Sequence, residues 1–268
     1  GKNSDIGLSI IKSTRLAINK INNSLIEIVP KDTQSNPEGT LKAAKELAKL
    51  NIKIVIGPVF NQNLVYLDEL TEINFLSLTN KSNNVSRNII NAGINSTSQI
   101  NAIKKFIELN EVKKTIFLTP DVDYKKEIER AISNSRIKII KNYVYSTDPT
   151  KLTKQIEKIT NYKTRKQNLE DEILRLEKLD DNSNDSLIEK LKKRDTLGNV
   201  NFDSIIIADF DESLKSVTTS LLYTDISPKK KYFITLNQWF DESLLKESSS
   251  QPIYFPSINK KNYEEFSE

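Results

Sequence analysis

The chain contains no cysteine, no histidine and no methionine among its 268 residues, and only six residues are glycine. Without cysteine there is neither a disulfide framework nor a thiolate nucleophile. Without histidine, the most common general base and metal ligand is missing, which argues against most hydrolase triads and most zinc sites. No glycine falls in a G-x-G-x-x-G, a G-x-x-x-x-G-K-[ST] or a G-x-S-x-G pattern, so neither a nucleotide cradle nor a nucleophile elbow is expected. We therefore expect no catalytic residues, no metal and no cofactor.

Long hydrophobic runs and a charge excess are also missing. No stretch approaches the roughly 20 apolar residues that a membrane helix needs. The 40 basic and 36 acidic residues are interspersed and give a net charge of +4. No basic stripe with interleaved aromatic residues is present, so a nucleic-acid partner is not expected. Because the chain starts at Gly1 and lacks methionine, we expect a mature or trimmed domain, with any signal peptide or lipidated cysteine upstream.

Apolar segments of strand length alternate with segments of helical spacing along the whole chain. Such alternation predicts βαβ units and parallel sheets. The segment 52–56 is apolar except for Lys53 and is predicted to be a fully buried strand. The other predicted strands are 25–29, 75–78, 89–92, 114–119, 137–145, 204–208 and 232–236. The predicted helices are 6–21, 37–48, 61–73, 96–109, 124–134, 211–223 and one that starts at Pro149.

The sequence therefore predicts an α/β fold of two doubly wound, parallel-sheet lobes around a cleft, since 268 residues suffice for two cores. We place the lobe boundary near residues 92–95, where no flexible linker interrupts the chain. The first lobe is predicted to comprise residues 1–93 plus 257–268, and the second lobe residues 94–256.

The segment 161–195 interrupts the alternation. It is dense in charge, yet Leu169, Ile173, Leu176 and Leu179 recur at a spacing of three to four residues. A polar break at 180–185 precedes a second apolar series. We predict a helical insert in the second lobe, folded as a hairpin. It is either a solvated surface elaboration or a docking element for a partner protein.

Ligands of doubly wound sheets sit beyond the carboxyl ends of the strands. The residues expected there are amide, hydroxyl, acidic or aromatic, a mixture that suits a small polar solute. The alternative is that these residues merely form polar loops and cap helices. The candidate ligand-binding residues are Asn61, Gln62, Thr79, Asn80, Tyr124, Asp209, Phe210, Asn237 and Trp239.

Several of these candidates have two interpretations. Asn61 and Gln62 are predicted to cap the helix after Gly57, where a helix N-terminus would also attract an anion. Asp209 and Asp211 could form a catalytic or metal-binding pair, but Asp211 is better explained as the N-cap of the following helix. Trp239, the only tryptophan, could be a core anchor or a wall of the cleft.

Two sets of residues resemble known families. Residues 54–58 read IVIGP and residues 75–80 read FLSLTN, and both resemble strands and turns of the type I periplasmic binding proteins for branched-chain amino acids. Residues 193–203 read KRDTLGNVNFD after the charged insert, and residues 237–242 read NQWFDE. Together these two runs resemble the penicillin-binding-protein activator family, lipoproteins of the same fold, over nearly the whole chain.

The resemblance implies a non-enzymatic periplasmic protein whose partner is a peptidoglycan synthase, that is, a penicillin-binding protein. Any membrane attachment would be an N-terminal lipid anchor to the outer membrane. It also implies that the first lobe is incomplete, with one strand expected before Gly1 and further elements after Glu268. The alternative function is a solute receptor of an ABC importer for amino acids or amides. By position, Asn61, Thr79, Tyr124 and Phe210 match loops that hold the amino acid in such receptors.

Overall fold

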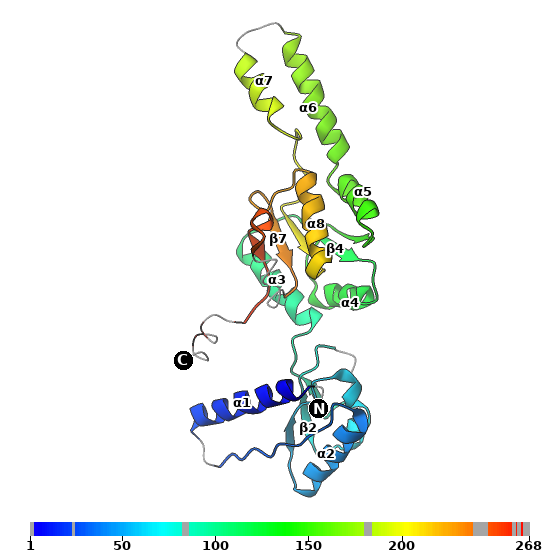
Figure 1. The fold of residues 1–268 in the computed structure, drawn as a ribbon, viewed down its shortest axis with the longest axis vertical. Coiled ribbons are helices and arrows are strands. Elements are labelled where there is room, and N and C mark those ends of the chain that lie inside the picture. Colours follow the sequence, from blue (N-terminus) through cyan, green and yellow to red (C-terminus); the bar gives the residue numbers. More distant parts are fainter. Residues whose placement is uncertain are drawn as a thin grey trace. The chain divides into compact units, whose positions relative to one another are not determined.

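The computed structural model describes residues 3–22, 25–81, 86–179, 184–237 and 246–258, together with Lys261 and Glu264 (Figure 1). The chain divides into two compact units, residues 1–95 and 96–268, and each is described by itself. The assignment of residues 257–268 to the first lobe stays a prediction. No helix in the described residues is long and apolar enough to cross a membrane.

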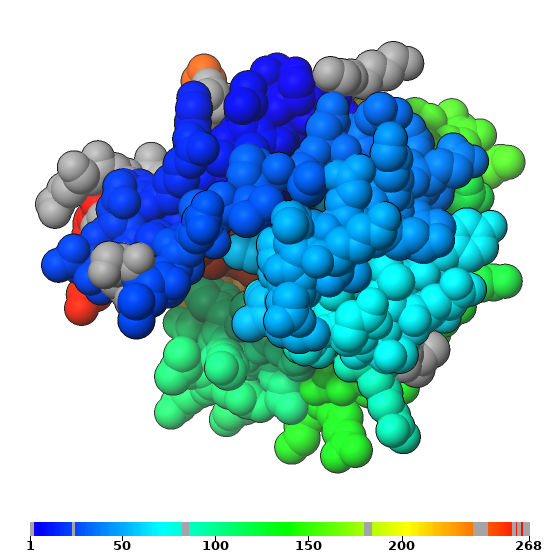
Figure 2. Space-filling model, turned by 90° about the horizontal axis from the view of Figure 1, so that it is seen from below, coloured from blue at the N-terminus to red at the C-terminus, as the bar shows by residue number. Residues whose placement is uncertain are grey.

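The first unit contains a parallel three-stranded sheet in the order β1-β2-β3. The strands are β1 (Ile54–Ile56), β2 (Asn74–Ser77) and β3 (Ile89–Asn91), and the helices are α1 (Ser4–Ile21) and α2 (Pro37–Lys49). α2 begins after Asn36, whose Oδ1 accepts the N–H of Gly39 at 2.7 Å, with Pro37 in the first helical turn. Ala44 of α2 packs in a core with Leu67 and Phe75. Figure 2 shows the surface of this unit, with α1 in dark blue.

One face of this sheet is open, so the prediction of a fully buried strand at 52–56 was wrong. Ile54 is 66% exposed, Ile56 is 49% exposed and Ile90 of β3 is 51% exposed. The pleat directs alternate side chains to opposite faces, and Val55 and Phe75 therefore point to the core face. The described core on this face includes residues of α2 and of the turns at 61–64 and 67–69, whereas no described core residue packs against Ile54, Ile56 or Ile90.

Two other predictions for the first unit were wrong. Residues 25–30 form no strand, and Leu25 is 92% exposed. An apolar segment becomes a strand only where a neighbouring strand satisfies its backbone groups, and no described strand pairs with this one. The predicted helix 61–73 is replaced by two short 3₁₀ turns, η1 (Asn61–Leu64) and η2 (Leu67–Glu69). Tyr66 adopts a φ of 71° between them, which α-helical backbone does not allow.

The second unit is a doubly wound sheet of five parallel strands in the order β5-β4-β6-β7-β8. Helices α3 and α4 cover one face, and helices α5 and α8 cover the other. The strands are β4 (Thr115–Pro120), β5 (Lys141–Tyr145), β6 (Ser204–Ile207), β7 (Tyr232–Thr235) and β8 (Ile253–Tyr254). The helices are α3 (Ser96–Leu109), α4 (Lys125–Ser135), α5 (Pro149–Ile159) and α8 (Asp211–Tyr223).

All residues of the central strands β4 and β6 are buried, as expected of a parallel sheet covered on both faces. Phe117 and Ile206 pack against α3 and α4. Leu118 and Ile205 pack on the opposite side against α5 and α8. The sequence pattern predicted every strand of this sheet except the two-residue β8.

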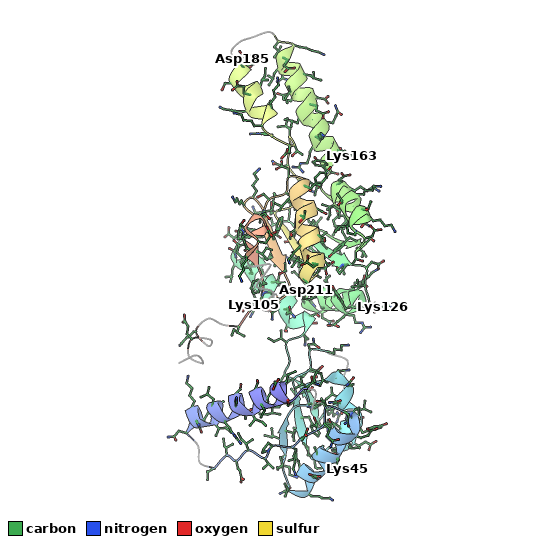
Figure 3. The ribbon with its side chains drawn as sticks, in the orientation of Figure 1. Lys45, Lys105, Lys126, Lys163, Asp185 and Asp211 are labelled. Carbon is green, nitrogen blue, oxygen red and sulfur yellow. The ribbon has the colours of Figure 1, made fainter. Side chains whose placement is uncertain are left out.

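The segment 161–195 folds into a helical hairpin of α6 (Tyr162–Glu177) and α7 (Asp185–Lys192). The two helices share a small core of their own, formed by Leu169, Leu176 and Leu191. Figure 3 labels Lys163 where α6 leaves the rest of the unit and Asp185 near the far end of the hairpin. The hairpin thus projects away from the sheet of the second unit (Figure 1).

Candidate functional site

The candidate site of the second unit lies at the point where its strand order reverses. β4 is the first strand of the unit, and its neighbours are β5 on one side and β6 on the other. In this order of strands, the loops after the first and third strands diverge and leave a crevice at their carboxyl ends. A cavity of about 550 Å³ lies at these ends. Its lining residues are Val122, Tyr124, Thr147, Asp209, Phe210, Asp211, Glu212, Ser213 and Ser216.

Asp209 is the centre of the hydrogen bonds at this site. It follows β6 directly and is only 4% exposed. Its Oδ1 accepts the N–H of Phe210 at 2.9 Å and the hydroxyl of Tyr124 at 3.3 Å. Its Oδ2 accepts the hydroxyls of Tyr145 at 2.5 Å and Ser213 at 2.6 Å. Because both oxygens are engaged by the protein, the carboxylate holds the loops in place and leaves ligand contact to its neighbours.

Two tyrosines respond to this environment. Burial raises the pKa of the Tyr145 hydroxyl far above its usual value, and the negative charge of Asp209 raises it further. The pKa of Tyr124 is raised by the same two causes, burial being the larger. Both hydroxyls therefore stay protonated at neutral pH and act as hydrogen-bond donors. The ring of Tyr124 meets the ring of Phe210 edge-on, with 6.1 Å between their centroids.

The structure brings three of the sequence-predicted residues together, namely Tyr124, Asp209 and Phe210. Asn237 follows β7 and does not line this cavity; its N–H donates to Oε1 of Gln99 at 2.8 Å. Trp239 lies outside the described residues. The combination of aromatic rings and fixed hydroxyls suits a small ligand with both apolar and polar groups.

The remaining candidates belong to the first unit. Thr79 is buried, and its hydroxyl oxygen accepts the N–H of Lys81 at 3.2 Å. Asn80 is exposed in the loop after β2, and Gln62 is exposed in η1 beside the half-buried Asn61. These four residues follow β1 and β2, so each lies beyond the carboxyl end of a strand. Their role as ligand contacts stays a prediction.

The predicted helix caps were wrong in both units. η1 begins after Phe60 without a side-chain cap, so Asn61 and Gln62 lie inside a four-residue 3₁₀ turn and cap no α-helix. Asp211 is the first residue of α8, with a φ of 48°, and Phe210 occupies the cap position. No side chain caps the first turn of α8, and Asp211 therefore has no capping role. No group of three acidic residues that could hold a metal occurs among the described residues.

Sequence reasoning missed Tyr145, Ser213 and Thr147. Tyr145 ends a strand that was predicted correctly, so its position at a carboxyl end was a usable signal. Ser213 stands four residues after Asp209 in the first turn of α8, and no sequence pattern pointed to it. Both residues complete the hydrogen bonds around Asp209.

The architecture defines a class. Two α/β units with parallel sheets, the second one with a crevice at its switch point, have the fold of the type I periplasmic binding proteins. No family model and no curated protein sequence matches the chain.

The named likenesses come from solved structures. Full-length LpoA from Haemophilus influenzae is 14% identical with a TM-score of 0.54, over 85% of this chain and 35% of that chain. The C-domain of LpoA from the same organism, described as a regulator of PBP1A, is 15% identical with a TM-score of 0.52, over 80% of this chain and 56% of that one. A binding protein for leucine, isoleucine, valine, threonine and alanine from Brucella ovis is 10% identical with a TM-score of 0.49, over 90% of this chain and 58% of that chain. At these identities the likeness to LpoA shows the fold alone.

Proposed function

We propose that this chain belongs to a non-enzymatic binding protein of the bacterial periplasm that regulates a penicillin-binding protein. The similarity to the LpoA C-domain, a regulator of PBP1A, supports this proposal. The chain spans 56% of that C-domain, so the partner and the activity are part of the proposal. Attachment to the outer membrane through a lipid belongs to the same proposal.

The observation that carries the proposal is the α6–α7 hairpin. Its own leucine core makes it a stable projection rather than a loose loop. Its surface nevertheless keeps apolar side chains in water, with Leu174, Leu179 and Leu187 all exposed. Exposed leucines on a projecting element offer apolar anchors that a partner protein could bury. We therefore assign the docking of the synthase to the hairpin.

The cavity around Asp209 supports a second function, that of a solute receptor for an amino acid or an amide. Its position at the switch point of the sheet is the position that ligands favour in such folds. Tyr124 and Phe210 would provide the apolar contacts. In this function the protein would deliver its ligand to an ABC importer.

A binding experiment tests the docking proposal. The periplasmic part of a class A penicillin-binding protein from the same organism is immobilised, and the binding of this protein is followed by biolayer interferometry. The double variant Leu174→Ser/Leu187→Ser should bind at least about tenfold more weakly, because buried apolar anchors carry most of an interface's energy. Leu109→Ser on α3 is the matched control, since Leu109 is also exposed and lies outside the hairpin.

Undiminished binding by the double variant would overturn the role of the hairpin. Absence of binding by the wild type would overturn the regulator function itself.

The receptor function is tested by thermal unfolding with a panel of amino acids and amides. A ligand at 100 times its dissociation constant adds about 2.7 kcal/mol of stability, and Phe210→Ala should reduce that gain.

A further inference from the structure

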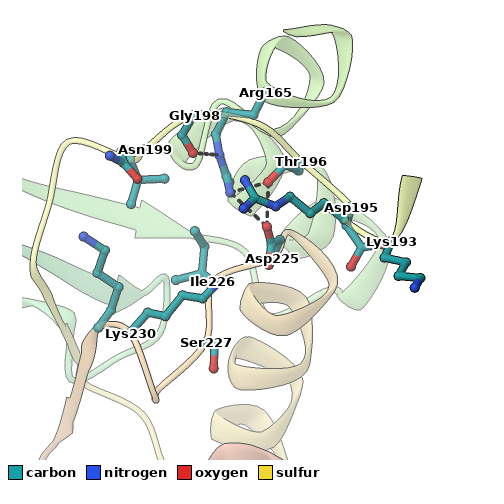
Figure 4. A pocket seen from close by; sticks show the side chains of 13 residues that line it. Arg165, Lys193, Asp195, Thr196, Gly198, Asn199, Asp225, Ile226, Ser227 and Lys230 are labelled. Atoms are coloured by element: carbon teal, nitrogen blue, oxygen red, sulfur yellow. Dashed lines mark hydrogen bonds and ion pairs between the residues drawn. The ribbon is translucent and has the colours of Figure 1, made fainter. Parts of the chain in front are cut away.

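A second cavity lies at the base of the hairpin, away from the Asp209 site. Its volume is about 380 Å³, and it is enclosed by the loop after α7 and the loop after α8 (Figure 4). Its lining side chains are mostly polar, and most of the charged ones are basic. The charged residues that line the Asp209 cavity are all acidic. The cationic lining residues are Arg165, Lys193, Arg194, Lys230 and Lys231, and the anionic ones are Asp195 and Asp225.

Arg165 builds the floor of this cavity. It is buried, and its guanidinium donates to the carbonyl oxygens of Gly198 and Thr224 and to the Thr196 hydroxyl at 2.6 Å. It also pairs with Asp225 at 3.5 Å, and Thr196 donates to the same carboxylate at 2.6 Å. The dashed lines in Figure 4 show this network. The carboxylate of Asp225 is therefore engaged by Arg165 and Thr196, and its negative charge is offset by Arg165 rather than by the cations at the rim.

The rim carries more positive than negative charge, because among the lining residues Asp195 is the one remaining carboxylate beside Lys193, Arg194 and Lys230. Lys231 forms an ion pair with Asp203 at 3.8 Å. Lys193 extends away from the floor network in Figure 4. Arg194 and Lys230 line the cavity without an ion pair to any carboxylate in the described part of the chain. Two cations of different chemistry thus line one cavity, an arginine that can bind two oxygens at once and a lysine that acts as a point charge.

We propose that this cavity binds a small multivalent oxyanion, held by Arg194 and Lys230 over the Arg165 floor. The volume admits a small molecule. Phosphoryl and carboxylate groups share the required chemistry of several oxygens with delocalised negative charge. Binding there would bridge the loop after α7 to the loop after α8, and so fix the base of the projecting hairpin. This inference is independent of the proposed partner of the hairpin.

Isothermal titration calorimetry with inorganic pyrophosphate and, separately, with citrate tests the proposal and distinguishes the two kinds of oxyanion. The wild type should bind at least one of them. Lys230→Ala and Arg194→Ala should each weaken that binding about tenfold or more, since hydrogen bonds to charged groups are strong. Lys229→Ala is the matched control, because Lys229 is also exposed, is the neighbour of Lys230 in sequence and does not line the cavity. Circular dichroism of each variant verifies the fold.

Binding of pyrophosphate alone would assign a phosphate-bearing ligand, and binding of citrate alone would assign a polycarboxylate. If neither probe binds the wild type at millimolar concentration, the proposal is overturned. It is also overturned if Lys229→Ala loses as much affinity as Lys230→Ala, because the binding would then depend on overall charge and not on the cavity.

Discussion

The hydroxyl of Tyr145 donates a hydrogen bond of 2.5 Å to Oδ2 of Asp209. This bond joins the carboxyl end of β5 to the carboxyl end of β6, across the intervening β4. Both side chains are buried, so the bond is shielded from competing water. The floor of the Asp209 cavity thus depends on a contact between strands that are not neighbours in the sheet.

Replacing Tyr145 with phenylalanine should destabilise the protein by about 1–3 kcal/mol, because a buried carboxylate loses one of its donors. The melting temperature should fall by roughly 2–4 °C for each kcal/mol lost, in a unit of this size. Differential scanning calorimetry measures the change. Tyr143→Phe is the control, since the Tyr143 hydroxyl has no hydrogen-bond partner in the described residues. Equal losses in the two variants would contradict the importance of the Asp209 bond.

The raised pKa values of Tyr124 and Tyr145 predict how stability depends on pH. A folded-state pKa above the unfolded value gives a contribution that is fully present below the unfolded pKa of about 10 and is lost as pH rises further. The stability advantage of the wild type over Tyr145→Phe should therefore be constant between pH 7 and pH 9 and shrink above about pH 10. Urea denaturation of both proteins across this range measures it. An advantage that grows with pH would contradict the assigned protonation state.

Removing the side chain of Arg165 should loosen the hairpin. Arg165→Ala leaves the carbonyl groups of Gly198 and Thr224 without their donor and Asp225 without its partner. Leaving buried polar groups without their hydrogen-bond partners costs about 1–3 kcal/mol. Hydrogen exchange of α6 and α7 should accelerate more than that of β4 and β6.

The control for Arg165 is Arg175→Ala. Arg175 lies on the same helix but is exposed, and it pairs with Glu172 at 2.8 Å one turn away. Exposed pairs of this kind contribute about 0.3–0.5 kcal/mol. If Arg175→Ala accelerates exchange in the hairpin as strongly as Arg165→Ala, the buried network is not what holds the hairpin.

Gly93 should not tolerate a methyl group. A Cβ on Gly93 would lie 2.1 Å from the carbonyl oxygen of Thr79 and 2.5 Å from that of Leu78, and backbone atoms cannot move aside cheaply. We expect Gly93→Ala to lower the melting temperature and to disturb the loop of the candidate residues Thr79 and Asn80. Gly7→Ala is the opposite case, because a Cβ there meets nothing within 4 Å. In helix α1 that change should be neutral or stabilising by up to about 1 kcal/mol.

The second unit was predictable from the sequence because local pattern and tertiary environment agree there. The segment 204–208 is apolar, and β6 is indeed buried on both faces. Pro149 marks the start of α5, and Asp148 caps it through the N–H of Thr150 at 3.0 Å. In the first unit the local sequence pattern and the tertiary environment disagree. The segment 52–56 is also mostly apolar, with Lys53 as its one polar residue, but one face of its sheet is uncovered.

The candidate site was predictable only in part, for a related reason. Strand ends can be located along the sequence, and this placed Tyr124, Asp209 and Phe210 correctly at one cavity. The bond from Tyr145 to Asp209 spans 64 positions and depends on strand order, which the sequence pattern does not specify. The cavity above Arg165 was equally hidden, because a single arginine in a charged segment has no distinguishing pattern.

The open sheet face of the first unit has a consequence for the protein in concentrated solution. The exposed face of this three-stranded sheet carries the apolar side chains of Ile54, Ile56 and Ile90. An exposed apolar strip of this kind favours self-association in concentrated solution. Lysine at position 54 or 56 would improve solubility and leave the core around Phe75 on the opposite face intact. The solubility of this protein at high concentration therefore depends in part on these exposed isoleucine side chains.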